Sequence, residues 1–198
     1  MARRRNRYLD MESRYARAVR RNLVSARPGI HSCVLVLDGL KPDFNIGKIF
    51  RSADAFGARE IHLVNVDIFD PEPAKGSVRW VPFTRHPDFA ACHQLLRPQG
   101  YTFVTFEPGR GRRLDRSDLP RQVAFVLGHE EFGLSFDPAG YPDILPLSIP
   151  QWGHVQSLNV SIAASIALYE YVRQHGLPLE EGFVRRGREE ALLEEAER

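Results

Sequence analysis

The chain has 198 residues, of which 43% are hydrophobic and 26% charged, and its formal net charge is +2. This balance is typical of one globular domain with short appendages, and a domain of this size needs no disulfide or metal to fold. No apolar stretch is long enough to span a membrane, and the basic start is not followed by the apolar core of a signal peptide.

A basic helix is predicted over residues 1–28, where Pro28 and Gly29 end it. It carries nine arginines against only Asp10 and Glu12 among the acids. The planar guanidinium suits phosphate geometry, so we expect this segment to attract polyanions such as RNA. A codon bias toward arginine is the alternative explanation. An arginine-rich mitochondrial leader is a weaker alternative, against which the two acids argue.

Apolar runs predict five strands, at residues 33–37, 61–66, 101–106, 123–127 and 144–149. Apolar positions at helical spacing predict helices at residues 45–57, 89–96 and 157–173. Strands alternating with helices indicate an α/β fold with a mainly parallel sheet flanked by helices. We therefore expect a basic helical extension over 1–30, one α/β domain over 31–176 and a charged terminal helix over 177–198.

Two connecting stretches are expected to be loops. Residues 67–81 contain two prolines and a glycine, and a glycine-rich stretch holds a second basic cluster, namely Arg110, Arg112, Arg113 and Arg116. Trp80 and Trp152 could stack on nucleic-acid bases or pack in a core or interface.

No metal or disulfide chemistry is expected from the cysteines and histidines. Cys33 and Cys92 form no C-x-x-C pair, and the seven histidines show no H-E-x-x-H or other ligand spacing. Unpaired cysteines fit a reducing, cytoplasmic setting.

The segment Asn45–Gly57 follows the turn after the first strand, where open α/β sheets bind ligands. Asn45 could simply cap the helix and Gly47 could allow close packing. On a helical wheel the apolar residues share one face, whereas Arg51 points roughly opposite, able to meet a phosphate or a hydroxyl.

The segment Gly128–Ser135 begins where a buried strand ends. Gly128 and Gly133 could let backbone amides approach a ligand closely, and Glu130 lies at the carboxyl end of the strand, where sites form. An ordinary strand-to-helix turn would have the same pattern.

The segment Ile149–Ala163 leads into an apolar helix. Ser157 is predicted to cap that helix, and exposed amides beside it would make a phosphate site. Asn159 is expected in the first turn, where a buried amide needs partners.

Taken together, these three segments resemble the SpoU (TrmH-type) branch of the SPOUT RNA methyltransferases, and the run Ser157-Leu158-Asn159-Val160-Ser161 is close to a signature. The resemblance covers roughly residues 33–173. It implies a parallel-sheet α/β domain over 31–176 whose carboxyl-terminal part forms a deep trefoil knot, a rare exception to the rule against knots. It also implies a homodimer with the active site at the subunit interface.

The same resemblance implies roles for individual residues. The catalytic residues would be Arg51, Asn45, Glu130, Ser157 and Asn159, with Ser157 holding a substrate phosphate. The cofactor S-adenosylmethionine would be contacted mostly by backbone near Thr105, Gly128, Ile149 and Leu158. One departure is visible, because Gln151-Trp152 stands where the family usually has methionine after Ile-Pro.

The implied reaction is methylation of a ribose 2′-hydroxyl in structured RNA. We expect Arg51 to act electrostatically on the developing alkoxide or through the phosphate, because an arginine pKa above about 12 makes it a reluctant base. Transfer RNA, with a D-loop guanosine as target, is expected ahead of 23S ribosomal RNA. A knotted RNA-binding protein without catalysis is the alternative from another class.

Overall fold

The protein is described by a computed structural model over residues 2–177, with side chains from Leu9 onward. The charged helix expected over 177–198 therefore lies outside the described residues, apart from Leu177, which follows the last helix as irregular chain. No helix in the described part is long and apolar enough to cross a membrane.

A single sheet forms the centre of the molecule, and each of its strand pairs is parallel. Its strands lie in the order β3-β2-β1-β6-β4-β7-β5. Their bounds are β1 Cys33–Asp38, β2 Glu60–Val64, β3 Phe83–His86, β4 Thr102–Phe106, β5 Arg112–Arg113, β6 Val123–Gly128 and β7 Ile144–Ser148. The predicted α/β fold with a parallel sheet is confirmed.

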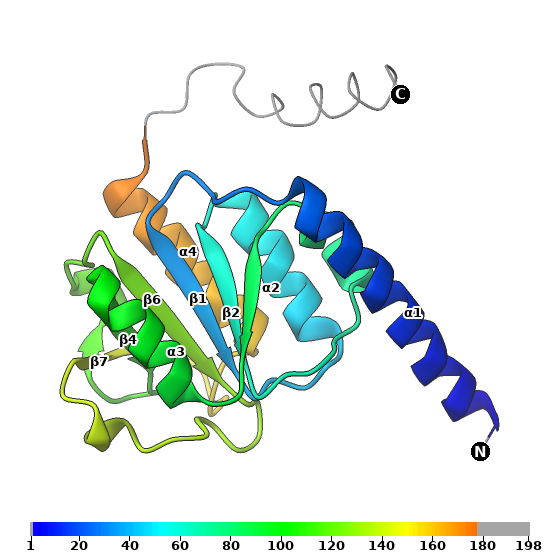
Figure 1. Ribbon diagram of the computed structural model, residues 1–198. Helices are drawn as coiled ribbons and strands as arrows, with labels where there is room; N and C mark the ends of the chain where they lie inside the picture. The colour runs from blue at the N-terminus through cyan, green and yellow to red at the C-terminus, as the bar shows by residue number, and fades with distance from the viewer. Residues whose placement is uncertain (1, 178–198) are drawn as a thin grey trace.

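Helices cover both faces of this sheet (Figure 1). Their bounds are α1 Ala2–Ser25, α2 Phe44–Ala55, α3 Phe89–Leu96 and α4 Val160–His175. Helices α2 and α4 bury the larger apolar cluster against one face, and α3 buries a second cluster against the other. Successive residues of β1 alternate between the clusters, so the strand is fully buried and reads as one apolar run.

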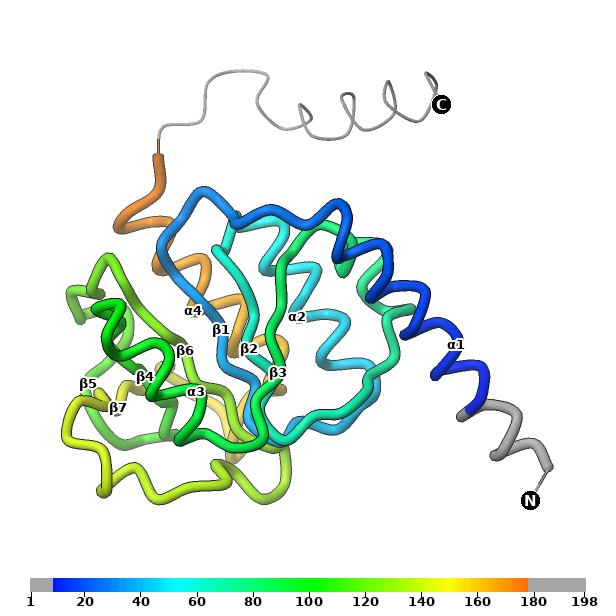
Figure 2. The backbone as a smooth tube through the Cα atoms, in the orientation of Figure 1, coloured from blue at the N-terminus to red at the C-terminus, as the bar shows by residue number. Residues whose placement is uncertain are grey.

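The basic helix α1 packs against the connection that follows β2 (Figures 1 and 2), and its amino end extends away from the sheet (Figure 1). Tyr15 contacts Phe69 edge to face, with ring centroids 5.2 Å apart. The buried Asn22 donates hydrogen bonds to the carbonyls of Val78 and Val81, at 2.6 and 2.8 Å. The carboxyl half of the helix is therefore fixed to the domain.

Two strands were not expected from the sequence. β3 follows the stretch predicted as a loop, which instead forms the 3₁₀ helices Glu72–Ala74 and Ser77–Arg79. β3 has no fully buried residue and alternates weakly, so it lacks an apolar signal. β5 consists of two arginines from the predicted basic loop, and pairing with β7 alone makes it a strand.

Candidate functional site

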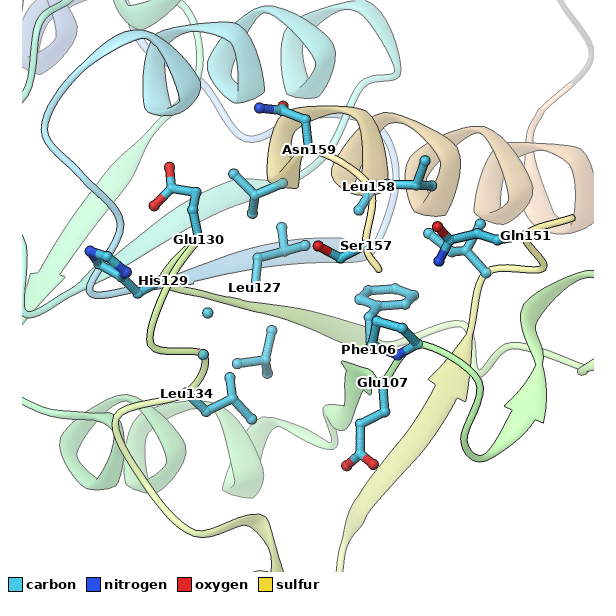
Figure 3. Close-up of a pocket in the computed structure, with 17 residues that line it drawn as sticks. Phe106, Glu107, Leu127, His129, Glu130, Leu134, Gln151, Ser157, Leu158 and Asn159 are labelled. Carbon is cyan, nitrogen blue, oxygen red and sulfur yellow. The ribbon is translucent and has the colours of Figure 1, made fainter. Parts of the chain in front are cut away.

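A pocket of about 510 Å³ opens at the carboxyl ends of β4 and β6, beside the start of α4 (Figure 3). Parallel sheets place ligands at this edge, because loops from neighbouring strands converge there. The pocket is lined by residues from three stretches of chain. They are Phe106–Pro108, most of Val126–Leu134, and part of Ile149–Ala163. The second and third stretches contain the motifs singled out from the sequence.

A chain of hydrogen bonds joins all three sequence segments at the rim of this pocket. Asn45 Nδ2 donates to Glu130 Oε1 at 2.7 Å, and Asn159 Nδ2 donates to Asn45 Oδ1 at 3.2 Å. Figure 3 shows Glu130 and Asn159 on the same side of the pocket, from the loop after β6 and the start of α4. The structure thus brings together three of the predicted catalytic residues, which are far apart in the sequence.

Glu130 is held as a carboxylate. Burial would raise its pKa, but the hydrogen bond from Asn45 and backbone N–H groups, including that of Lys41, outweigh it, and the pKa is lowered. Lys41 Nζ pairs with the neighbouring Glu131 at 3.2 Å. The rim of the pocket therefore carries a fixed negative charge beside two carboxamides.

The loop after β6 folds back on itself as a tight turn. The N–H of His129 donates to the carbonyl of Gly133 at 2.8 Å, and the reverse bond is 2.9 Å. A Cβ on Gly128 would lie 2.5 Å from the carbonyl carbon of Gly133, and Gly133 has φ +73°. Glycine is thus required at position 128 because the backbone of Gly133 packs against it. The sequence had instead suggested that a ligand approaches this position.

Asp38 anchors the far end of this loop, a role that was not predicted from the sequence. It ends β1, is 0% exposed, and accepts hydrogen bonds from Ser135 N and Ser135 Oγ at 2.6 and 2.7 Å. The sequence feature that could have indicated this role is an aspartate directly after a fully apolar strand. A buried carboxylate there requires hydrogen-bond donors.

The start of α4 differs from the prediction. Asn159, not Ser157, is the N-cap, and its Oδ1 accepts hydrogen bonds from Ser161 N at 2.9 Å and Ser161 Oγ at 2.6 Å. Asn159 is also exposed rather than buried in the first turn. Ser157 lies before the helix, exposed and lining the pocket. The predicted N-cap was wrong because the side-chain oxygen of Asn159, two residues after Ser157, accepts the hydrogen bond from the helix N–H of Ser161.

Of the four residues expected near the cofactor, Gly128, Ile149 and Leu158 line the pocket. Thr105 does not, since it is 1% exposed within β4, and the next residue, Phe106, lines the pocket instead. Gln151 also lines the pocket, across from Glu130 in Figure 3, and its buried Oε1 has no hydrogen-bond partner among the described residues.

Arg51 is separated from this pocket. It is exposed on α2, does not line the pocket and makes no hydrogen bond or ion pair with any described residue. The adjacent Ser52 faces α4 instead, where its Oγ lies 2.7 Å from Ser165 Oγ. The wheel prediction that Arg51 points away from the core is confirmed.

An aromatic and basic surface flanks the pocket where β5 pairs with β7. Trp152 is 86% exposed, which excludes core packing within the chain. The guanidinium carbon of Arg113 lies 6.0 Å from the centre of its ring. Arg112 and Arg113 form β5, so these two members of the second basic cluster are held by strand pairing rather than carried on a free loop.

Known proteins are similar to this chain in sequence and in fold. The profile of the SpoU rRNA Methylase family matches residues 32–169. A 23S rRNA (guanosine-2′-O-)-methyltransferase of Nitrosomonas europaea is 36% identical over 72% of this chain and 56% of its own length. A tRNA (guanosine(18)-2′-O)-methyltransferase of Thermus thermophilus is 34% identical over 71% of this chain and 74% of its own.

The solved structure of the SpoU methyltransferase AviRb of Streptomyces viridochromogenes, in complex with its cofactor AdoMet, is also similar. It superposes with a TM-score of 0.64 and 30% identity, over 74% of this chain and 58% of that one. The matched part is thus little more than half the length of two of these three proteins. The matched profile, the parallel sheet and the three converging motifs lead to one conclusion, that the chain belongs to the SpoU methylase family.

Proposed function

We propose that the protein is an S-adenosylmethionine-dependent methyltransferase that acts on a ribose 2′-hydroxyl in structured RNA. The observation that carries the proposal is the hydrogen-bonded set Glu130–Asn45–Asn159 at the rim of the pocket. A knotted RNA-binding protein without catalysis would have no need to hold these three residues in this hydrogen-bonded arrangement.

The residues of the pocket fit the cofactor. A space of about 510 Å³ suits a ligand of this size, and the side chains of Leu127, Leu134 and Leu158 supply apolar surface. The unpartnered Oε1 of Gln151 is an acceptor for a ligand N–H. When bound, S-adenosylmethionine supplies a methyl group on a sulfonium, an electrophile that needs no metal. Gly128, Ile149 and Leu158 would hold it through the backbone.

The other residues would handle the RNA. Ser157, exposed beside the pocket, would donate a hydrogen bond to a substrate phosphate. Arg51 would stabilise the negative charge that develops on the 2′-oxygen, either directly or through that phosphate. Fixing the hydroxyl in line with the methyl donor supplies proximity.

We further propose a homodimer whose active site combines residues of both subunits. Arg51 does not line the pocket of its own chain, and Phe44, Ile162 and Tyr169 on α2 and α4 are 50–61% exposed. A second copy against this face would cover the apolar side chains and bring Arg51 to the partner's pocket. The trefoil knot of the carboxyl-terminal part and a cytoplasmic location, which the two unpaired buried cysteines favour, belong to the same proposal.

Transfer RNA is the substrate that we favour, with a D-loop guanosine as target. The tRNA-modifying relative is covered over 74% of its length and the rRNA-modifying relative over 56%, so more of the former has a counterpart here. The exposed Trp152 beside Arg113 offers a stacking surface for an unpaired base of a loop.

The test is methyl transfer from labelled S-adenosylmethionine to total tRNA and, separately, to ribosomal RNA, followed by mapping of ribose methylation. We expect incorporation into tRNA at one guanosine. Incorporation into 23S rRNA alone would replace the tRNA proposal. A protein that binds the cofactor yet methylates neither RNA would contradict the enzymatic function.

A further inference from the structure

A second cluster of reactive side chains lies beneath α3, on the face of the sheet opposite α2 and α4. His62 in β2 is 1% exposed, Cys92 in α3 is 0% exposed, and the half-buried His86 ends β3. One ligand atom from each of the three residues lies within 4.8 Å of the other two. The cluster could not be predicted from sequence spacing, because its three members come from three different elements.

Hydrogen bonding within the chain accounts for only part of the cluster. His62 Nδ1 and His86 Nε2 lie 2.9 Å apart, as in a bond between two imidazoles. That bond leaves His62 Nε2 buried without a hydrogen-bond partner among the described residues, and Glu60 Oε1 is 3.7 Å from it. The Cys92 thiol makes no hydrogen bond with any described residue. The Cys92 sulfur is therefore available as a ligand to an ion bound between the two imidazoles.

We propose that His62, His86 and Cys92 bind one Zn²⁺ ion, with Nδ1 of His62, Nε2 of His86 and Sγ of Cys92 as its protein ligands. Imidazole and thiolate are the ligands that zinc prefers, and tetrahedral sites separate them by about 3.3–3.5 Å. The two nitrogens, now 2.9 Å apart, would separate by a few tenths of an ångström. The sulfur, whose distance from the other ligand atoms is at most 4.8 Å, would approach by up to about 1.3 Å.

Solvent reaches the cluster from one side. His86 lines a shallow surface pocket of about 420 Å³ together with Asn65, Asp67 and Arg85. This opening gives the ion a path of entry and leaves room for a water as fourth ligand. On the opposite side the apolar cluster beneath α3 surrounds Cys92 and excludes water.

The charges around the cluster favour a cation. The carboxylate of Glu60 lies 3.7 Å from His62 Nε2 and places negative charge beside the cluster. The same negative field attracts Zn²⁺, which would displace the thiol proton to solvent. This carboxylate could also orient the His62 ring from the Nε2 side.

A bound ion would fasten β3, the exposed edge of the sheet, to β2 and α3.

Cobalt titration of the metal-free protein tests the site, because Co²⁺ replaces Zn²⁺ and reports a thiolate ligand by a charge-transfer band. We expect the band to saturate at one equivalent in the wild type and in Cys33→Ser, which alters the other fully buried cysteine. Cys92→Ser should abolish the band, and His86→Gln should weaken Co²⁺ binding at least tenfold. Zn²⁺ should raise the melting temperature of the wild type and not of these two variants.

The absence of a charge-transfer band in the folded wild type, or an equal band in Cys92→Ser, would overturn the site in favour of a plain histidine–histidine hydrogen bond. If Cys92→Ser fails to fold, the His86→Gln variant provides the test, because the His86 side chain is only half-buried and its replacement should be tolerated. Affinity unchanged in that variant would also overturn the proposal. Neither readout depends on methyl transfer, so failure here leaves the proposed function intact.

Discussion

Asn45, Glu130 and Asn159 meet although they lie more than 25 residues apart in the sequence. Asn45 is the central member, since its amide donates to Glu130 and its carbonyl oxygen accepts from Asn159. Each carboxamide has one donor and one acceptor satisfied by a specific neighbour, so the set is sensitive to single substitutions.

Replacing Asn45 by alanine should raise the pKa of Glu130, because the hydrogen bond from Asn45 is the largest contribution that lowers it. A carboxyl group whose pKa is lower in the folded than in the unfolded protein stabilises the fold at pH values above its unfolded-state pKa. This stabilisation is lost as the pH falls through the folded-state pKa. The variant should therefore lose less stability on acidification. Carbon-13 NMR titration of the carboxyl measures the shift; Asp43→Asn, at a side chain without a capping bond, is the control. An unchanged Glu130 pKa in Asn45→Ala would contradict this account.

Replacing Arg51 by alanine should lower the methylation rate by about 10²–10³-fold, the effect of losing one charge-stabilising donor. Cofactor affinity should remain at the wild-type value, because Arg51 does not line the pocket. Single-turnover kinetics and calorimetric titration separate the two quantities. A near-normal rate with RNA still bound would exclude Arg51 from catalysis.

At the scale of elements, the loop after β6 is shaped by close backbone approach. Gly128→Ala would place a Cβ 2.5 Å from the backbone of Gly133, so the turn must shift. We expect a loss of roughly 1–3 kcal/mol in stability and at least tenfold weaker cofactor binding. Gly140→Ala, where the added Cβ meets nothing within 4 Å, should change neither. Thermal unfolding and calorimetry check both; equal behaviour of the two variants would refute the packing argument.

The attachment of α1 can be tested at Asn22. Alanine there leaves the carbonyls of Val78 and Val81 without their donor, which should cost about 1–3 kcal/mol. Urea unfolding measures the change, and Leu23→Ala, at a side chain that is 79% exposed, is the control. A loss below about 0.5 kcal/mol would indicate that α1 contributes little to the fold.

The elements with strong apolar patterns were predictable from the sequence, and those defined by neighbours were not. The run Cys33–Leu37 and the helix Phe89–Leu96 were placed to within a residue. β5 has no apolar residue, and only pairing with β7 makes it a strand. The same holds for the site. Sequence motifs indicated Glu130 and Asn45, whereas the hydrogen bonds between Asp38 and Ser135 arise only from tertiary contact.

At the scale of the whole molecule, the composite dimer makes a quantitative prediction. Mixing Arg51→Ala with a pocket variant such as Gly128→Ala should regenerate about a quarter of wild-type activity. Half of the dimers would be mixed, and each mixed dimer would hold one complete site. The subunits must first be exchanged, and light scattering should give twice the chain mass of 22.6 kDa. No recovery in verified mixed dimers would place Arg51 in its own subunit's site.

The most direct test of the account is the chemical form of the transferred methyl group. Purified protein is incubated with labelled S-adenosylmethionine and tRNA, and the RNA is then hydrolysed in alkali. A 2′-O-methyl group blocks cleavage at its own nucleotide, so the account predicts label in alkali-resistant dinucleotides and its loss in Arg51→Ala. Label in mononucleotides, as from a methylated base, would contradict it.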